Sequence, residues 1–222
     1  RGVRETMTQK DRTTILVRHG WGLGFIFLTY LLVSIARRVR ADYAPEIWRA
    51  LGSPAAPALF SQSEIVVALA VLVVNGLSVL IVDNRRAFLL ALGVAGSGGL
   101  LMLAAILGQN QGWLGPFGFM VLLGTGLYLP YVAIHTTVFE RLIAMTRDRG
   151  NIGFLMYVAD SVGYLGYAGL LIARNWLPAG NDFLRFFLVT TGVVAILVCV
   201  CQALAWARFV APSRANTEGA AA

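Results

Sequence analysis

The sequence predicts an all-α, polytopic membrane protein with six transmembrane helices. Hydrophobic residues make up 58% of the chain and charged residues only 13%, and the mean hydropathy is +0.72. A soluble domain carries about a quarter charged residues. The uncharged runs are about as long as the roughly 20 residues that cross the hydrocarbon core as a helix. Helices are favoured over barrel strands because the alternation of barrel strands is absent and a helix satisfies its own backbone groups.

Six apolar runs separated by short polar or charged segments carry this prediction. The first is the shortest, because its uncharged core of 17 residues runs directly into Arg37 and Arg38. We expect the spans near His19–Ala36, Ser63–Val82, Ala87–Gly108, Pro116–Phe139, Ile152–Ala173 and Phe183–Ala207.

The segments outside the bundle at residues 19–210 are polar. Residues 1–18 form a basic lead, read as a cytoplasmic lead-in or a linker between two halves of a larger protein. The lead makes a poor signal peptide, because its charged region is long and no small-residue cleavage site follows. The chain begins with Arg1, so we expect its start to be an internal cut or a fragment boundary. Residues 211–222 are expected to be a disordered cytoplasmic tail.

The distribution of Lys and Arg predicts the orientation in the membrane. Twelve of the 18 basic residues fall on the side of both termini and six on the other side. Both termini are therefore expected in the cytoplasm. The formal net charge of +7 serves this topology. It forms no basic patch interleaved with aromatic residues, so membrane lipid is an expected partner and nucleic acid is not.

The loop after the first span contains a segment of mixed character near residues 37–52. Tyr43 and Trp48 stand among charges there, which is typical of an amphipathic helix in the headgroup layer. Outside the cytoplasm, such a segment is either an interfacial anchor or a gate for substrate. Arg37 and Arg40 share a helical face, so they form either an anion-attracting pair facing inward or a pair that reaches out to the headgroups.

The fourth span carries a polar stripe and a helix breaker. Tyr128, Tyr131 and His135 lie at spacings of three and four and share a face. Pro130 frees a backbone carbonyl one turn earlier, which requires another partner in lipid. These residues are expected either to line a solute cavity or to pack and hydrogen-bond between helices. Asn75, in the second span, is a further candidate for the pathway.

The fifth span has the clearest pattern. Tyr157, Asp160, Tyr164 and Tyr167 lie on one side of the helix, beside a seam of three glycines at Gly163, Gly166 and Gly169. An ionisable residue in a membrane span is a functional candidate by default. Asp160 pairs with a cation, accepts protons, is kept neutral by burial, or has a structural role. Its candidate partners are His135 and the Arg37 and Arg40 pair.

The remaining spans predict close packing and offer no catalytic chemistry. Ala91, Ala95 and Gly99 recur at four-residue spacing, which permits close helix contact. Cys199 and Cys201 are turned about 200° apart on a helix, so they cannot share a metal ion. Neither a nucleophile with a base nor a metal-ligand cluster is present. We therefore expect no enzyme activity, no catalytic residue, no cofactor and no metal site.

Several long motifs resemble a known family. ADYAPEIWRALG, DNRRAF, GLYLPYVAIHTTVFERLIA and GNIGFLMYVADSVGYLG are similar to the C-terminal half of the DUF5690 family of uncharacterised bacterial proteins. The six-span layout also resembles one half of a major facilitator superfamily transporter. The resemblance covers nearly all of the chain.

This resemblance implies a twelve-span protein whose first six spans are missing here, or are replaced by a second copy. Spans one, two, four and five would line the central cavity, and spans three and six would lie outside it. The cytoplasmic gate motif of the superfamily would correspond to Asp83, Arg85 and Arg86. Its glycines do not align, since Gly76 stands seven residues before Asp83 and no glycine precedes the paired arginines.

The leading functional hypothesis is one half of a secondary active transporter in the bacterial inner membrane. It would move a small polar or anionic solute by alternating access. Proton coupling would run through Asp160 and His135. The alternative hypothesis is a non-transporting six-helix module that senses or assembles with other membrane proteins.

Overall fold

The structure, a computed structural model, describes residues 13, 17–54, 56–146, 152–173 and 181–210. Most of the predicted lead at 1–18 and all of the predicted tail at 211–222 lie outside these residues. Within them every regular element is helical, and six helices are long and apolar enough to cross a membrane. The prediction of an all-α chain with six transmembrane helices is confirmed.

The helices follow one another with short connections. In order they are α2 (Gly20–Asp42), α3 (Ala44–Ala50), α4 (Pro57–Leu77), the 3-10 turn η1 (Ser78–Leu80), α5 (Asn84–Asn110), α6 (Pro116–Ala133), the π-helical segment η2 (Ile134–Val138), α7 (Phe139–Thr146), α8 (Ile152–Ala173) and α9 (Asn181–Val210). The candidate fourth span runs from Pro116 to Met145, through α6, η2 and most of α7.

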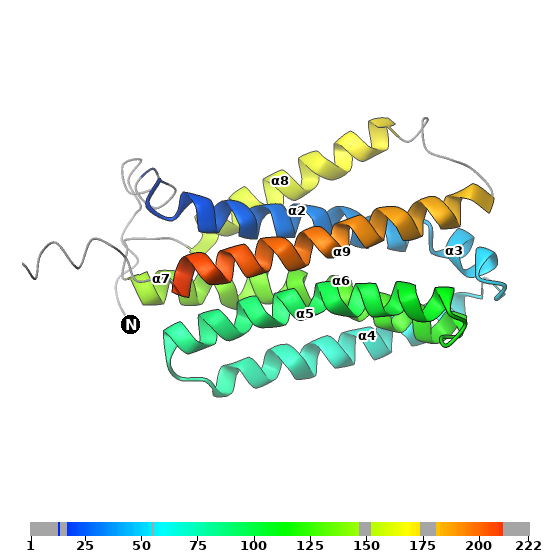
Figure 1. The fold of residues 1–222 in the computed structure, drawn as a ribbon, viewed down its shortest axis with the longest axis horizontal. Helices are drawn as coiled ribbons and strands as arrows, with labels where there is room; N and C mark the ends of the chain where they lie inside the picture. The colour runs from blue at the N-terminus through cyan, green and yellow to red at the C-terminus, as the bar shows by residue number, and fades with distance from the viewer. Residues whose placement is uncertain (1–12, 14–16, 55, 147–151, 174–180, 211–222) are drawn as a thin grey trace, which may run out of the picture.

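The bundle has a tightly packed centre and two outlying helices. α5 packs against α6 and α9, and α2 packs against α9, α6 and α8. α4 lies along α6 at one edge of the bundle, and α8 leans away from the bundle at the opposite edge, where its main neighbours are α2 and α7 (Figure 1). α4 and α8 are the least buried of the six candidate spans.

The two ends of the bundle carry different connections. The start of α2, the turn between α4 and α5, the end of α7 and the end of α9 lie at one end (Figure 1). α3 and the turn between α5 and α6 lie at the other end. This arrangement agrees with the predicted alternation of the spans, and the assignment of one end to the cytoplasm stays a prediction.

Two helices begin or end away from their predicted bounds. α2 continues past Ala36 to Asp42, because protein partners surround the arginines in its last turns. α4 begins at Pro57 instead of near Ser63. Proline lacks a backbone N–H, and the first helical turn needs none, so Pro57 can start the helix there.

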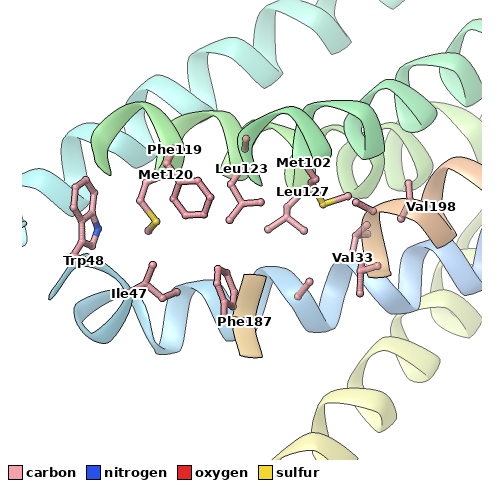
Figure 2. Close-up of a cluster of buried hydrophobic side chains, with 14 of the residues drawn as sticks. Val33, Ile47, Trp48, Met102, Phe119, Met120, Leu123, Leu127, Phe187 and Val198 are labelled. Atoms are coloured by element: carbon pink, nitrogen blue, oxygen red, sulfur yellow. The ribbon is translucent and has the colours of Figure 1, made fainter. Parts of the chain in front are cut away.

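The segment predicted to lie in the headgroup layer packs closely against the bundle. Its first residues belong to α2, and α3 crosses the end of the bundle. Trp48 is only 1% exposed and lies against the rings of Phe60 and Phe117. Figure 2 shows Ile47 and Trp48 beside Met120 and Phe119 at one end of the main apolar core. Trp48 therefore packs inward, and the place of this segment in the headgroup layer stays a prediction.

Glycines bring α5 into close contact with both of its neighbours. A Cβ at Gly98 would lie 2.4 Å from Pro130 Cδ and 2.5 Å from the Gly126 carbonyl oxygen of α6. A Cβ at Gly99 would lie 2.9 Å from the Ala195 carbonyl oxygen of α9. The close helix contact predicted from the small residues of this span is confirmed. The carbonyl that Pro130 deprives of its usual donor faces α5.

The fourth span changes its helical geometry just after Pro130. Residues Ile134–Val138 form a π-helical segment, in which backbone hydrogen bonds join residues five apart instead of four. Such segments rotate the residues that follow relative to those before. Tyr131 and His135 can thus face α2 and α8, while Val138 and Phe139 enter the second apolar core with residues of α2.

Replacing Gly98 by Ala tests the contact between α5 and α6. The new Cβ meets backbone and a rigid proline ring, so the helices must separate, at a cost of about 1–3 kcal/mol. The melting temperature of the purified protein should fall by about 3–10 °C. Gly24→Ala in α2 is the control, because no atom lies within 4 Å of its new Cβ. Equal melting temperatures for the two variants would refute the contact.

Candidate functional site

A polar pocket lies between α2, α6 and α8. It is lined by Tyr30, Ser34, Arg37 and Arg38 of α2, Tyr131 of α6, and Asp160, Gly163 and Tyr164 of α8. Its volume is about 20 Å³, which is room for a water molecule or two. Four of the side chains predicted for the solute pathway therefore line one pocket.

Asp160 is held by side chains from the two neighbouring helical segments. The Tyr30 hydroxyl donates a hydrogen bond of 2.5 Å to Asp160 Oδ1. His135 Nε2, in the π-helical segment, lies 3.6 Å from Asp160 Oδ2. Both the His135 and the Asp160 side chains are about one third exposed. Oδ1 of the carboxylate thus accepts the Tyr30 hydrogen bond, and Oδ2 faces His135.

Three rings form a wall of the site. The ring centroids of Tyr30 and Tyr131 are 5.2 Å apart, and that of His135 lies 6.1 Å from each of them. All three pairs are nearly parallel. Stacking fixes the planes of these rings, so it directs the Tyr30 hydroxyl and the His135 ring nitrogen toward Asp160.

Arg37 and Arg38 are held by aromatic rings of different helices. The Arg37 guanidinium carbon lies 4.4 Å from the ring centroid of Tyr131 and 5.2 Å from that of Tyr128. The Arg38 guanidinium carbon lies 4.7 Å from the ring centroid of Tyr164 and 5.0 Å from that of Tyr167 on α8. Cation–π contacts of this kind orient a guanidinium without neutralising its charge.

Tyr167 makes a second contact between α8 and α2. Its hydroxyl donates a hydrogen bond to Asp42 at the end of α2. Asp42 is exposed and does not line the pocket. Tyr167 therefore ties α8 to α2 on the α3 side of the pocket, one turn beyond Tyr164.

Arg40 does not form an anion-binding pair with Arg37. Its Nη1 donates to Glu64 Oε1 of α4 at 2.7 Å, and its Nη2 donates to the Met120 carbonyl of α6 at 2.9 Å. The side chain is buried, and Gly124 leaves room for it. The expected pairing is corrected, because Glu64, which sequence analysis did not single out, neutralises Arg40.

Other predicted site residues lie away from the pocket. Asn75 donates to the Val71 carbonyl of its own helix. Tyr157 is 76% exposed on the outer side of α8.

The predicted gate residues have local roles at the start of α5. Asp83 caps α5 by accepting a hydrogen bond of 2.7 Å from the Arg86 backbone N–H. Arg85 reaches the Val210 carbonyl at the end of α9, at 3.5 Å. All three residues are exposed, and their role as a cytoplasmic gate stays a prediction.

Sequence analysis missed three residues of the pocket, and all three lie on α2. Tyr30, Ser34 and Arg38 recur at four-residue spacing, so they share a helical face. The same kind of polar stripe was used to select residues in the fourth and fifth spans. Reading the first span as a continuous helix past Ala36 would have revealed it.

The pocket holds no arrangement suited to a metal ion. Among the described residues no group of three His, Cys, Asp or Glu side chains comes together. His135 and Asp160 are a pair of proton-binding groups beside two fixed cations.

Comparisons with known proteins place the chain in one family. A model for the "Family of unknown function (DUF5690)" matches residues 1–211. No curated protein and no solved structure matches the chain.

Removing the carboxylate beside Arg40 should destabilise the bundle. In Glu64→Gln the buried guanidinium loses its counterion. Breaking a fully buried pair costs about 3–5 kcal/mol, and we expect about 1–3 kcal/mol here because Glu64 is half exposed and partly screened. The melting temperature should fall. The control is Glu46→Gln, an exposed residue of α3. A Glu64→Gln protein as stable as this control would contradict the role of the pair.

Proposed function

The chain belongs to the DUF5690 family, whose function is unknown, and we propose that it is one six-helix half of a secondary active transporter. It moves a small polar or anionic solute across the membrane by alternating access and couples this movement to protons. The observation that carries the proposal is the pocket in which Asp160 meets Tyr30 and His135 beside Arg37 and Arg38.

The chemistry of this pocket supports proton coupling. Burying an ionisable pair inside a membrane protein is costly and marks ion and substrate pathways. Asp160 accepts the Tyr30 hydrogen bond on Oδ1, while Oδ2 faces His135 Nε2 at 3.6 Å. One proton bound between Oδ2 and the imidazole changes the charge of the site by one unit. That change alters the affinity for any charged solute held near Arg37 and Arg38.

The packing of α8 supports movement around this pocket. α8 is held to α2 by side-chain contacts at Asp160 and Tyr167, and its neighbours in the described chain are few. Because α8 is hydrogen-bonded to α2 at two residues and packs lightly elsewhere, it can tilt relative to α2 with little loss of apolar contact. Alternating access in transporters uses rigid movements of this kind around a site near the membrane midplane.

The proposal includes a second six-helix bundle as partner. Apolar and aromatic side chains on α4 and α8 are widely exposed, among them Tyr157 and Tyr164 of α8. A hydroxyl on an exposed ring inside the membrane favours a protein or water-filled surface over lipid. An N-terminal six-helix half, or a second copy, would cover this side. The expected location is the bacterial inner membrane, with both termini in the cytoplasm.

A second candidate function uses the same exposed side. A six-helix sensor or assembly module would bind another membrane protein through α8, where Tyr157 is 76% and Tyr164 59% exposed. In that case, the pocket between α2 and α8 would be a packing interface and would stay closed to water.

Replacing Asp160 by Asn tests the proton coupling. The amide keeps the size of the carboxylate but cannot take up a proton. The intact protein is reconstituted into vesicles loaded with a pH-sensitive dye and exposed to small carboxylates, phosphate, sugars and amino acids. Solute-driven proton uptake seen with the wild type should fall to the level of empty vesicles in Asp160→Asn.

The exposed acidic residue Glu46 provides the control, and Glu46→Gln should retain full proton uptake. Transport with an unchanged pH dependence in Asp160→Asn would show that the coupling assignment is wrong.

Accessibility of Tyr164 separates the two candidate functions. Cys199 and Cys201 are first replaced by Ala, and Cys is then placed at Tyr164 or at the buried Ala159. For a transporter, a membrane-impermeant thiol reagent should modify Tyr164→Cys and leave Ala159→Cys unmodified. Failure of both positions to react would favour the packing module.

A further inference from the structure

The pocket contains two cations, Arg37 and Arg38, that form no ion pair with an acidic side chain of the described residues. Among the described residues, neither Arg37 nor Arg38 lies within ion-pair distance of a carboxylate. Arg40, only one turn away, has both Glu64 and a carbonyl as partners. The protein thus neutralises one buried arginine with a carboxylate and leaves two beside a cavity.

Aromatic rings contact both of these cations. Tyr128 and Tyr131 lie against Arg37, and Tyr164 and Tyr167 lie against Arg38, at 4.4–5.2 Å. These contacts leave the positive charge in place, and the N–H donors of a guanidinium lie at its edge, in the plane of the group. A planar carboxylate or a phosphate oxygen pair fits such an edge with two parallel hydrogen bonds.

Buried polar atoms beside the cations lack partners. Ser34 is only 4% exposed, and its Oγ has no hydrogen-bond partner among the described residues. Arg37 Nε is likewise buried without a partner in this part of the chain, as is Arg40 Nε. Buried polar groups are normally paired, and an exception needs an explanation. Ser34 lines the same pocket as Arg37 and Arg38, so a ligand oxygen between them would satisfy the hydroxyl.

From these contacts we infer that Arg37, Arg38 and Ser34 form a binding site for an oxyanion with one negative charge, either a carboxylate or a phosphate monoester that retains one proton. The two arginines and the Asp160 carboxylate leave one net positive charge among the lining residues, which one bound anion balances. Because the cavity holds only a water or two, the anionic group enters it and the rest of the ligand stays outside or requires α8 to move away from α2.

The proposal rests on the proposed function in one respect, which is that Asp160 shares the site. A negative Asp160 repels the anion, and a protonated Asp160 does not. The other charged or titratable side chains that line the pocket are Tyr30, Tyr131, Tyr164 and the two arginines, and His135 faces Asp160 from beside it. Linkage requires that a proton on Asp160 strengthens anion binding and that the anion strengthens proton binding equally.

The test measures binding and not transport. The intact protein is placed in nanodiscs of neutral phosphatidylcholine, and its melting temperature is followed during titration with acetate, lactate, benzoate and inorganic phosphate. A ligand that binds the folded state raises the melting temperature with concentration. We expect one or more of these anions, but not choline, to do so for the wild type.

Matched variants assign the effect to residues. Arg37→Gln with Arg38→Gln should weaken anion binding about tenfold or more, since each removes a charge-assisted contact. Arg49→Gln, an exposed arginine of α3, should bind as the wild type does. Ser34→Ala and Arg37→Lys preserve the fold more conservatively, and each should weaken binding severalfold. Asp160→Asn should bind the anion more tightly even though it loses proton coupling.

The outcomes separate the possibilities. Two results would overturn the site. One is an unchanged anion response in the double arginine variant and in Ser34→Ala. The other is no response to any anion in nanodiscs of phosphatidylcholine or of phosphatidylglycerol. If anionic phosphatidylglycerol nanodiscs stabilise the wild type through Arg37 and Arg38 and abolish the response to soluble anions, the oxyanion belongs to a lipid headgroup. Anion binding with normal variant effects but no transport would retain the site and reject the proposed transport function.

Discussion

A carboxylate inside a membrane bundle must find its partners on other helices, and this requirement determines how α2, α6 and α8 meet. Asp160 lies in a pocket with room for only a water or two, and Tyr30 and His135 reach it from two neighbouring segments. The approach is possible because α8 presents glycines to α2. A Cβ at Gly163 would lie 3.5 Å from Ser34 and Tyr30, and one at Gly166 would clash with Leu31. Side-chain chemistry and backbone proximity therefore depend on each other at this crossing.

Three arginines within four residues of α2 have very different surroundings. The helical turn points Arg40 toward α4 and α6, where Glu64 and a carbonyl satisfy it and the bundle gains a tie between helices. Arg37 points toward the tyrosines of α6, and Arg38 toward those of α8. Rings orient a cation but leave its charge available. The same residue type is thus neutralised by a carboxylate at Arg40 and contacts aromatic rings at Arg37 and Arg38.

The fold could be read from the sequence because burial in lipid imposes length and apolarity on every span. The polar stripes of the fourth and fifth spans were also readable, since spacing alone put Tyr131 and His135 on one face and Asp160 and Tyr164 on another. The spacing of residues along one helix cannot show which residue of another helix lies opposite. Arg40 was paired with Arg37 because both share a helical face, whereas its partner, Glu64, lies on another helix. The inward packing of Trp48 could not be predicted either, because its aromatic and charged neighbours in the sequence do not reveal that α3 crosses the end of the bundle.

Pro130 and the π-helical segment at Ile134–Val138 together form a hinge in the fourth span. The part before it is fastened to α5 where Gly98 and Gly126 meet, and the part after it is embedded in the second core through Phe139 and Leu142. Regular helical hydrogen bonds are fewest between these two anchored parts. Bending is therefore concentrated at the turn that carries His135. A small change in the bend angle there alters the distance between His135 and Asp160, while the two ends of the span keep their contacts.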